Sequence, residues 1–131
     1  MSIVYLSLED LLALADDLGC LHVRDIGLLD SAAHRPASSP FGADAYAGVH
    51  EKAAVLLESI VRNQPLVDGN KRLGWLATYV FYEMNEYELE APDDDAYDLI
   101  VELASGAADF HRAAAVLALW TGGRGENRRV R

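Results

Sequence analysis

Two strongly helical segments, joined by a short break, constrain the fold of this chain most. From about Ala47 to Asn63 the apolar residues recur at the three- and four-residue spacing of an amphipathic helix, and the same spacing returns from Leu73 to Met84. Pro65 and Gly69 interrupt the pattern between them. The sequence therefore predicts a buried central helix, a loop, and a second strong helix that begins directly after the loop.

Capping residues and helix breakers predict four further helices around this pair. Serine and aspartate side chains accept hydrogen bonds from the free N–H groups at a helix start, whereas glycine and proline end helices. The expected helices run from Ser7 to Gly19, from Asp25 to Ala33, from Pro92 to about Ala104, and from Asp109 to Trp120.

The remaining segments give little sign of a sheet. Ala37 to Gly48 is expected to form a loop, and Tyr87 to Ala91 a short, extended segment. No run of alternating apolar and polar residues is long enough to require a sheet. The fold class is therefore all-α, a compact bundle of about six or seven helices.

Size and composition favour a single soluble domain. The chain has 131 residues, of which 51% are hydrophobic, enough to bury a core without disulfides or a structural metal. Cys20 is the only cysteine, so an internal disulfide is excluded, and no paired spacing of a zinc site is present. No stretch approaches the ~20 apolar residues of a membrane helix. We expect a cytoplasmic protein with no membrane contact.

The charge of the chain argues against a nucleic-acid partner. The formal net charge is −10, but residues 122–131 contain four arginines and one glutamate, a local charge of +3 that leaves −13 on the rest. Such a body repels phosphate backbones. The closing segment has no apolar periodicity, so we expect a domain at 1–121 followed by a flexible basic tail at 122–131.

The break between the two central helices carries the residues best suited to chemistry. Free N–H groups at a helix start, a glycine that allows close approach of the backbone, and nearby cations all favour phosphate, and Gly69, Lys71 and Arg72 meet these needs. Asp68 is a hard oxygen ligand of the kind that binds Mg²⁺. The amide of Asn70 can donate a neutral hydrogen bond.

The same residues also have a plain structural explanation. Asp-Gly and asparagine are common turn and capping residues at a loop–helix junction, and Lys71 and Arg72 can form a solvated first turn. A hairpin turn is excluded because the residues after Asn70 follow a helical period. From residue chemistry alone, a phosphate site and an ordinary junction both remain open.

The segment from Pro65 to Arg72 resembles the signature motif of the Fic/Doc family. That motif reads histidine, any residue, phenylalanine or a similar residue, any residue, aspartate or glutamate, glycine or alanine, asparagine, glycine or lysine, and arginine. Eight consecutive positions are compatible, and the stretches 23–32, 35–36 and 51–54 also look like Doc proteins. The resemblance covers the chain up to Trp120.

Two positions depart from the pattern of Fic adenylyltransferases. Fic adenylyltransferases have glycine where Lys71 stands and a second arginine where Trp75 stands. The lysine is similar to the Doc pattern, which implies a kinase that transfers the terminal phosphate of ATP to a threonine of elongation factor Tu and blocks translation. The resemblance implies ATP and Mg²⁺, with Asp68 as metal ligand and the residues from Gly69 to Arg72 around the phosphates. Nucleotidyl transfer from the same pocket is the enzymatic alternative.

Gln64 occupies the position of the family's catalytic histidine. That histidine is expected to take the proton of the attacking hydroxyl, which an amide cannot do near neutral pH. Loss of a general base typically costs about 10² to 10⁴ in rate, so the chain as written is expected to be nearly inactive. An engineered substitution and a natural inactive relative both explain Gln64, and a module that only binds nucleotide or antitoxin is the non-enzymatic alternative.

The resemblance also implies a separate antitoxin. Fic relatives can inhibit themselves through a helix in which glutamate follows serine or threonine by four positions, and no serine or threonine here has glutamate at that spacing. The implied partner is a Phd-type antitoxin whose terminal segment folds into an apolar groove beside the active site. Trp75, Tyr79 and Tyr82 are expected in the core or in the wall of such a groove.

The loop from Arg35 to Tyr46 has two interpretations. It lies where the family carries a flap that aligns the target segment, with Phe41 near its middle. It also reads as a plain connection between two helices. The four histidines have no metal-binding spacing and are expected to be surface or packing residues.

Overall fold

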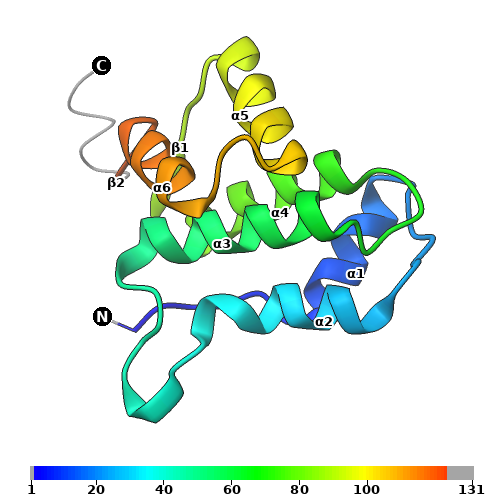
Figure 1. Ribbon diagram of the computed structural model, residues 1–131, viewed down its shortest axis with the longest axis horizontal. Helices are drawn as coiled ribbons and strands as arrows, with labels where there is room; N and C mark the ends of the chain where they lie inside the picture. Colours follow the sequence, from blue (N-terminus) through cyan, green and yellow to red (C-terminus); the bar gives the residue numbers. More distant parts are fainter. Residues whose placement is uncertain (1, 124–131) are drawn as a thin grey trace.

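The computed structural model describes residues 2–123, which form six α-helices, two 3₁₀ helices and two short strands. The expected all-α class is confirmed, and each of the six expected helices is present (Figure 1). In chain order the elements are α1 (Leu8–Asp17), α2 (Ile26–His34), η1 (Arg35–Ala37), η2 (Pro40–Gly42), α3 (Gly48–Asn63), α4 (Asn70–Met84), β1 (Tyr87–Leu89), α5 (Asp93–Ser105), α6 (Phe110–Leu119) and β2 (Thr121–Gly123).

Helix α3 is the central helix of the molecule. It contacts α2, α4, α5 and α6, and eleven of its sixteen residues are buried. Helix α4 packs most extensively against it, and Gly74 lies at their closest approach, because a Cβ atom there would come within 2.7 Å of Val61 Cγ1. The prediction of a buried central helix is confirmed.

Local hydrogen bonds begin and end the outer helices as expected. Ser7 forms a capping box with Asp10 at α1, each side chain accepting a hydrogen bond from the backbone N–H of the other. Asp25 caps α2 and Asp109 caps α6. Gly106 ends α5 in the left-handed conformation, at φ 85°.

A small antiparallel sheet joins two segments that are distant in sequence. Strand β1 pairs with β2, and Leu89 lies opposite Thr121 in the register. The extended segment at β1 was predicted, but its partner was not, because three residues containing two glycines carry no pattern of a strand. Gly122 and Gly123, the first residues of the expected tail, belong to β2; residues 124–131 lie outside the described part. No helix among the described residues is long and apolar enough to cross a membrane.

Candidate anion site between α3 and α4

The loop between the two central helices begins with a sharp change of backbone direction. Helix α3 ends at Asn63, and Gln64 adopts the left-handed conformation, at φ 52° and ψ 62°. Its N–H donates to the Ile60 oxygen at 3.1 Å. The following Pro65 explains why the helix stops, since a residue before proline is disfavoured in right-handed helical geometry.

Asn70 holds the loop closed. Its Oδ1 accepts a hydrogen bond from the Leu66 N–H at 2.9 Å, and its Nδ2 donates to the Leu66 oxygen at 3.0 Å. Leu66 itself is buried, so this reciprocal pair satisfies both of its backbone groups. Only the second Nδ2 hydrogen of Asn70 is left to donate to a phosphate, because the first donates to Leu66. The expected role of Asn70 beside a phosphate stays a prediction.

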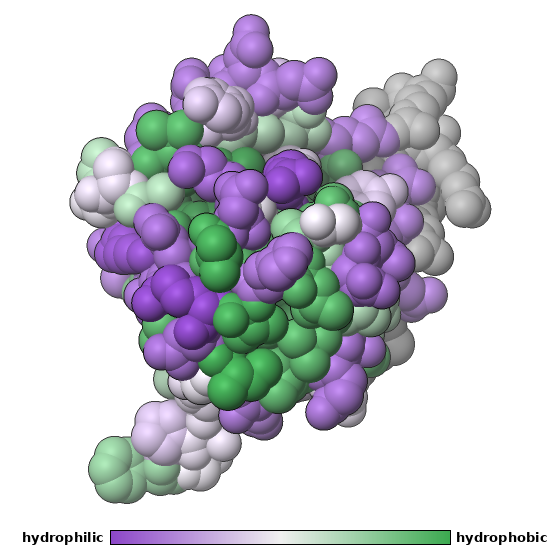
Figure 2. All heavy atoms as spheres, turned by 90° about the vertical axis from the view of Figure 1, so that its right-hand side faces the viewer, coloured by the Kyte–Doolittle hydropathy of each residue, from purple (hydrophilic) through white to green (hydrophobic). Residues whose placement is uncertain are grey.

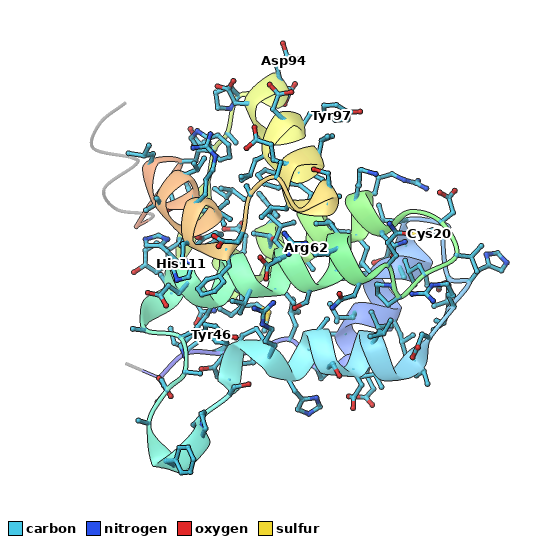
Figure 3. All side chains as sticks on the ribbon, in the orientation of Figure 1. Cys20, Tyr46, Arg62, Asp94, Tyr97 and His111 are labelled. Carbon is cyan, nitrogen blue, oxygen red and sulfur yellow. The ribbon has the colours of Figure 1, made fainter. Side chains whose placement is uncertain are left out.

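Gly69 is required by its surroundings as well as by its backbone angles. It has φ 87° and precedes α4. A Cβ atom at this position would lie 2.7 Å from the Sγ of Cys20 and 2.8 Å from its Cβ. The buried Cys20, labelled in Figure 3 at this end of the molecule, thus packs directly against the loop backbone.

The first turn of α4 opens onto a polar cavity. No side chain caps the N-terminus of α4, and a cavity of about 270 Å³ lies in front of it. Its walls contain all the predicted site residues together with two valines: Val61, Gln64, Val67, Asp68, Gly69, Asn70, Lys71 and Arg72. The structure thus brings Gln64 and Asp68 together with the cations at one cavity.

The charged side chains of this cavity are free to bind a ligand. Asp68, Lys71 and Arg72 are exposed, and within residues 2–123 none of the three forms an ion pair or a side-chain hydrogen bond with the protein. Two cations beside unused helix N–H groups favour an anion such as phosphate. In the described part of the chain no group of three acidic, histidine or cysteine residues could hold a metal.

An apolar groove adjoins the polar cavity. Its volume is about 520 Å³, and Lys71 and Arg72 line both spaces. Helix α4, the end of α1 and the first half of α5 form its walls, through Leu18, Trp75, Leu76, Tyr79, Ala91, Asp93, Ala96, Tyr97 and Ile100. Trp75, Tyr79 and Tyr82 were expected in the core or in a groove wall. Trp75 and Tyr79 line the groove, whereas Tyr82 is fully buried in the core.

Sequence reasoning missed a segment that supports the loop. Residues 22–25 run beside residues 63–67: the Val67 N–H donates to the His22 oxygen, and the N–H groups of Arg24 and Asp25 both donate to the Pro65 oxygen. Val23 and Leu66 form an isolated antiparallel bridge. No periodicity in the chain marks this contact across some forty residues, although the resemblance included residues 23–32.

The end of the molecule that carries the loop is partly apolar. Figure 2 views the structure from this side, and apolar surface lies there among polar side chains. Leu21, Ile26 and Val67 are among the exposed large apolar residues. They come from the supporting segment, the start of α2 and the loop itself.

The loop from Arg35 to Tyr46 lies elsewhere, which favours its interpretation as a plain connection. It leads into the N-terminus of α3, whose sixteen residues span about 24 Å. In Figure 1 its tip lies far from the loop between α3 and α4. The buried ammonium of Lys52 donates to the Pro36 oxygen and to Asp44, and Arg35 donates to the Tyr46 hydroxyl. This geometry does not support a flap over the anion site, and residues 22–25 lie beside the loop between α3 and α4 instead.

His50 and Tyr82, two residues with shifted pKa values, contact each other and lie away from the cavity. The Tyr82 hydroxyl lies 2.9 Å from Nδ1 of His50, near the first turn of α3. Burial lowers the pKa of His50. Burial also raises the pKa of Tyr82, and the nearby Tyr87 adds a smaller electrostatic contribution in the same direction. The pair thus belongs to the packing of α3 against α4 and not to the anion site.

Two comparisons with known proteins agree with this geometry. The model of the Fic/DOC family matches residues 5–82. The chain belongs to the Fic/Doc family. Its sequence is also 45% identical over 118 residues to "Toxin Doc" of Mycolicibacterium smegmatis (strain ATCC 700084 / mc(2)155), an alignment that spans 87% of this chain and 91% of that protein. The resemblance to Doc-type members of the Fic/Doc family is confirmed, and the match includes α1, α2, α3 and the anion-site loop.

Proposed function

We propose that this Fic/Doc protein is a Doc-like toxin of a toxin–antitoxin pair. In its active form, with histidine at position 64, it transfers the terminal phosphate of ATP to a threonine of elongation factor Tu and so blocks translation. The observation that carries this proposal is the polar cavity at the uncapped start of α4, which is lined by Gln64 and by the motif residues from Val67 to Arg72. The name of the relative that is 45% identical supports the role of a toxin.

The cavity suits the phosphates of ATP. Phosphate oxygens would accept hydrogen bonds from the free N–H groups of the first turn of α4, while Lys71 and Arg72 supply the positive charge. Gly69 leaves its backbone exposed to the cavity without a side chain in the way. Phosphoryl transfer depends mainly on such positioning and charge stabilisation.

Asp68 is the residue that fits Mg²⁺. Its carboxylate is exposed and lines the cavity. Mg²⁺ is usually held by one or two carboxylates together with phosphate oxygens and water, and a single aspartate beside the phosphate site meets that need. Bound there, the ion would neutralise charge on the phosphates.

Position 64 would carry the general base. Gln64 lines the same cavity and is exposed, so a histidine side chain there would face a hydroxyl group entering from solvent. The amide of glutamine cannot accept a proton at neutral pH, and we expect the chain as given to be slower by about 10² to 10⁴ than its histidine form.

The apolar groove fits a Phd-type antitoxin. It is lined mainly by apolar and aromatic side chains, with Lys71 and Arg72 at the side of the anion site and Asp93 at the start of α5. An amphipathic terminal segment of the antitoxin would bury its apolar face here and lie beside the anion site. Binding in this groove would place the antitoxin beside the two cations that the phosphates need.

Intact-mass analysis of elongation factor Tu tests the transferase activity. Purified elongation factor Tu is incubated with ATP and Mg²⁺, in parallel with the chain as given and with its Gln64→His variant. Addition of one phosphate by the histidine form alone is the expected result. An AMP adduct would instead show nucleotidyl transfer, and no adduct from either protein would favour a module that only binds nucleotide or antitoxin.

A groove substitution tests the antitoxin partner. Tyr79→Asp introduces a charge into the groove, whereas Leu119→Asp introduces the same charge at an exposed position of α6 outside it. We expect Tyr79→Asp to weaken binding of a co-expressed Phd-type antitoxin at least tenfold, as burial of an unpaired charge does. Equal binding of the two variants in a titration would place the antitoxin elsewhere.

A further inference from the structure

The guanidinium of Arg24 joins the end of α3 to the supporting segment. Its Nε donates to the Gln64 oxygen and its Nη2 donates to the Asn63 oxygen, both at 2.8 Å. These carbonyl groups belong to the helix end, where the last carbonyls have no partner within the helix. One planar side chain therefore satisfies two adjacent carbonyls at once.

Those two bonds define the backbone angles of position 64. A residue before proline avoids the right-handed helical region, which leaves extended and left-handed conformations. In the extended region ψ would be about 120 to 160°, which would rotate the Gln64 oxygen away from a guanidinium held at the Asn63 oxygen. At the observed ψ of 62°, the Asn63 and Gln64 oxygens both accept hydrogen bonds from the one guanidinium of Arg24.

We propose that Arg24 is a positioning residue that holds residue 64 in its left-handed conformation and so aims the side chain at position 64 into the anion cavity. This inference rests on the proposed function, because position 64 carries the general base there. Residue 64 lines the cavity beside Asp68 and Lys71, so a change of its backbone angles would move the base relative to the phosphates.

Removal of the Arg24 side chain leaves the rest of the support in place. The N–H of Arg24 still donates to the Pro65 oxygen, and the Val67 N–H still donates to the His22 oxygen, because neither bond uses the side chain. Arg24 is also exposed, so its loss creates no cavity in the core. We therefore expect Arg24→Ala to fold.

The chain offers a matched control in Arg62. Its Nε donates to the Leu103 oxygen and its Nη2 to the Ala108 oxygen, so it also bridges two carbonyls near a helix end, in this case the end of α5. Its loss removes a similar pair of bonds, and also a longer ion pair with Glu58 at 3.8 Å, without touching the carbonyls of residues 63 and 64. A purely structural effect would be shared by Arg24→Ala and Arg62→Ala.

The first arm of the test needs no activity. Backbone chemical shifts of residue 64 are measured by NMR in the chain as given, in Arg24→Ala and in Arg62→Ala. We expect the Cα and carbonyl shifts of residue 64 to leave their left-handed values in Arg24→Ala alone. Unchanged shifts in Arg24→Ala would overturn the inference.

The second arm measures turnover in proteins that also carry Gln64→His. Arg24→Ala is expected to lower kcat for phosphoryl transfer about 10- to 100-fold, the loss typical of a small misplacement of a catalytic group, with little change in the KM for ATP. Arg24→Lys lacks the planar guanidinium that donates to both carbonyls, so its kcat should remain close to that of Arg24→Ala. Added guanidinium ion at millimolar concentration should restore part of the kcat of Arg24→Ala. An unchanged kcat, or equal losses in Arg24→Ala and Arg62→Ala, would overturn the inference.

The two arms separate this inference from the proposed function. Failure of Gln64→His itself to modify any target would count against the proposed function. The chemical shifts of residue 64 would then decide alone whether Arg24 sets its conformation.

Discussion

Left-handed glycines in this chain differ in how strongly the surrounding structure requires them. Gly69 and Gly106 have nearly the same φ, 87° and 85°, but a Cβ atom on Gly69 would overlap Cys20, whereas one on Gly106 would meet nothing within 4 Å. Gly106→Ala therefore costs only the backbone strain, about 1 to 2 kcal/mol. Gly69→Ala should cost about 1 to 3 kcal/mol more through overpacking. Denaturant unfolding of both variants checks this, and equal losses would contradict the role of Cys20.

A second residue-scale prediction concerns His50 and pH. Burial lowers its pKa, so the folded protein favours the neutral ring, whose Nδ1 shares a hydrogen bond with the Tyr82 hydroxyl. The contribution to stability is thus complete above about pH 6.5, the unperturbed value, and is lost as the pH falls below it. In His50→Gln the decrease of Tm between pH 7 and pH 5 should be smaller. An equal decrease in His50→Gln and in the unmodified chain would show that His50 does not set this pH dependence.

At the scale of elements, the contact between α3 and α4 decides where the anion site lies. Both flanks of the site belong to these helices, and their separation is set by Gly74, which faces Val61 and Leu57. Gly74→Ala should force the helices apart and destabilise the fold by about 1 to 3 kcal/mol, although alanine is the better helix former.

Gly27 provides the comparison for this substitution. It lies in the first turns of α2, is exposed, and a Cβ atom there would meet only the Asp25 carboxylate, at 3.3 Å. Gly27→Ala should change the free energy of unfolding by much less than Gly74→Ala. If denaturant titration gave the same value for the two variants, close packing of α3 on α4 would not be the cause.

At the scale of the whole molecule, the excess of acidic residues should make stability depend on salt. With a net charge of −10, mutual repulsion opposes the compact state. Raising the ionic strength from about 0.01 M to about 0.15 M shortens the screening distance from about 30 Å to about 8 Å. We expect the Tm to rise over this range in a thermal scan with sodium chloride. A decrease would mean that the ion pairs, such as Arg35 with Glu58, outweigh the repulsion.

Much of the fold and of the site could be predicted from the sequence because the signals are local. Caps such as Ser7 and Asp25, the helix breaker Pro65, and the apolar spacing of α3 act within a few residues of themselves. The predicted site residues lie within nine positions of one another, so the loop between two helices necessarily brings Gln64 near Arg72. Their shared position at the start of a helix could therefore be predicted from the sequence.

Tertiary structure alone decided what surrounds that loop. The bonds from Arg24 to the end of α3, the packing of Cys20 on Gly69, and the groove shared by α1, α4 and α5 join segments that are tens of residues apart. The pairing of β1 with β2 and the position of the loop at Arg35 likewise depend on how the helices pack. Such contacts leave no periodic trace, because their geometry follows from the packing of whole helices and not from the preferences of neighbouring residues.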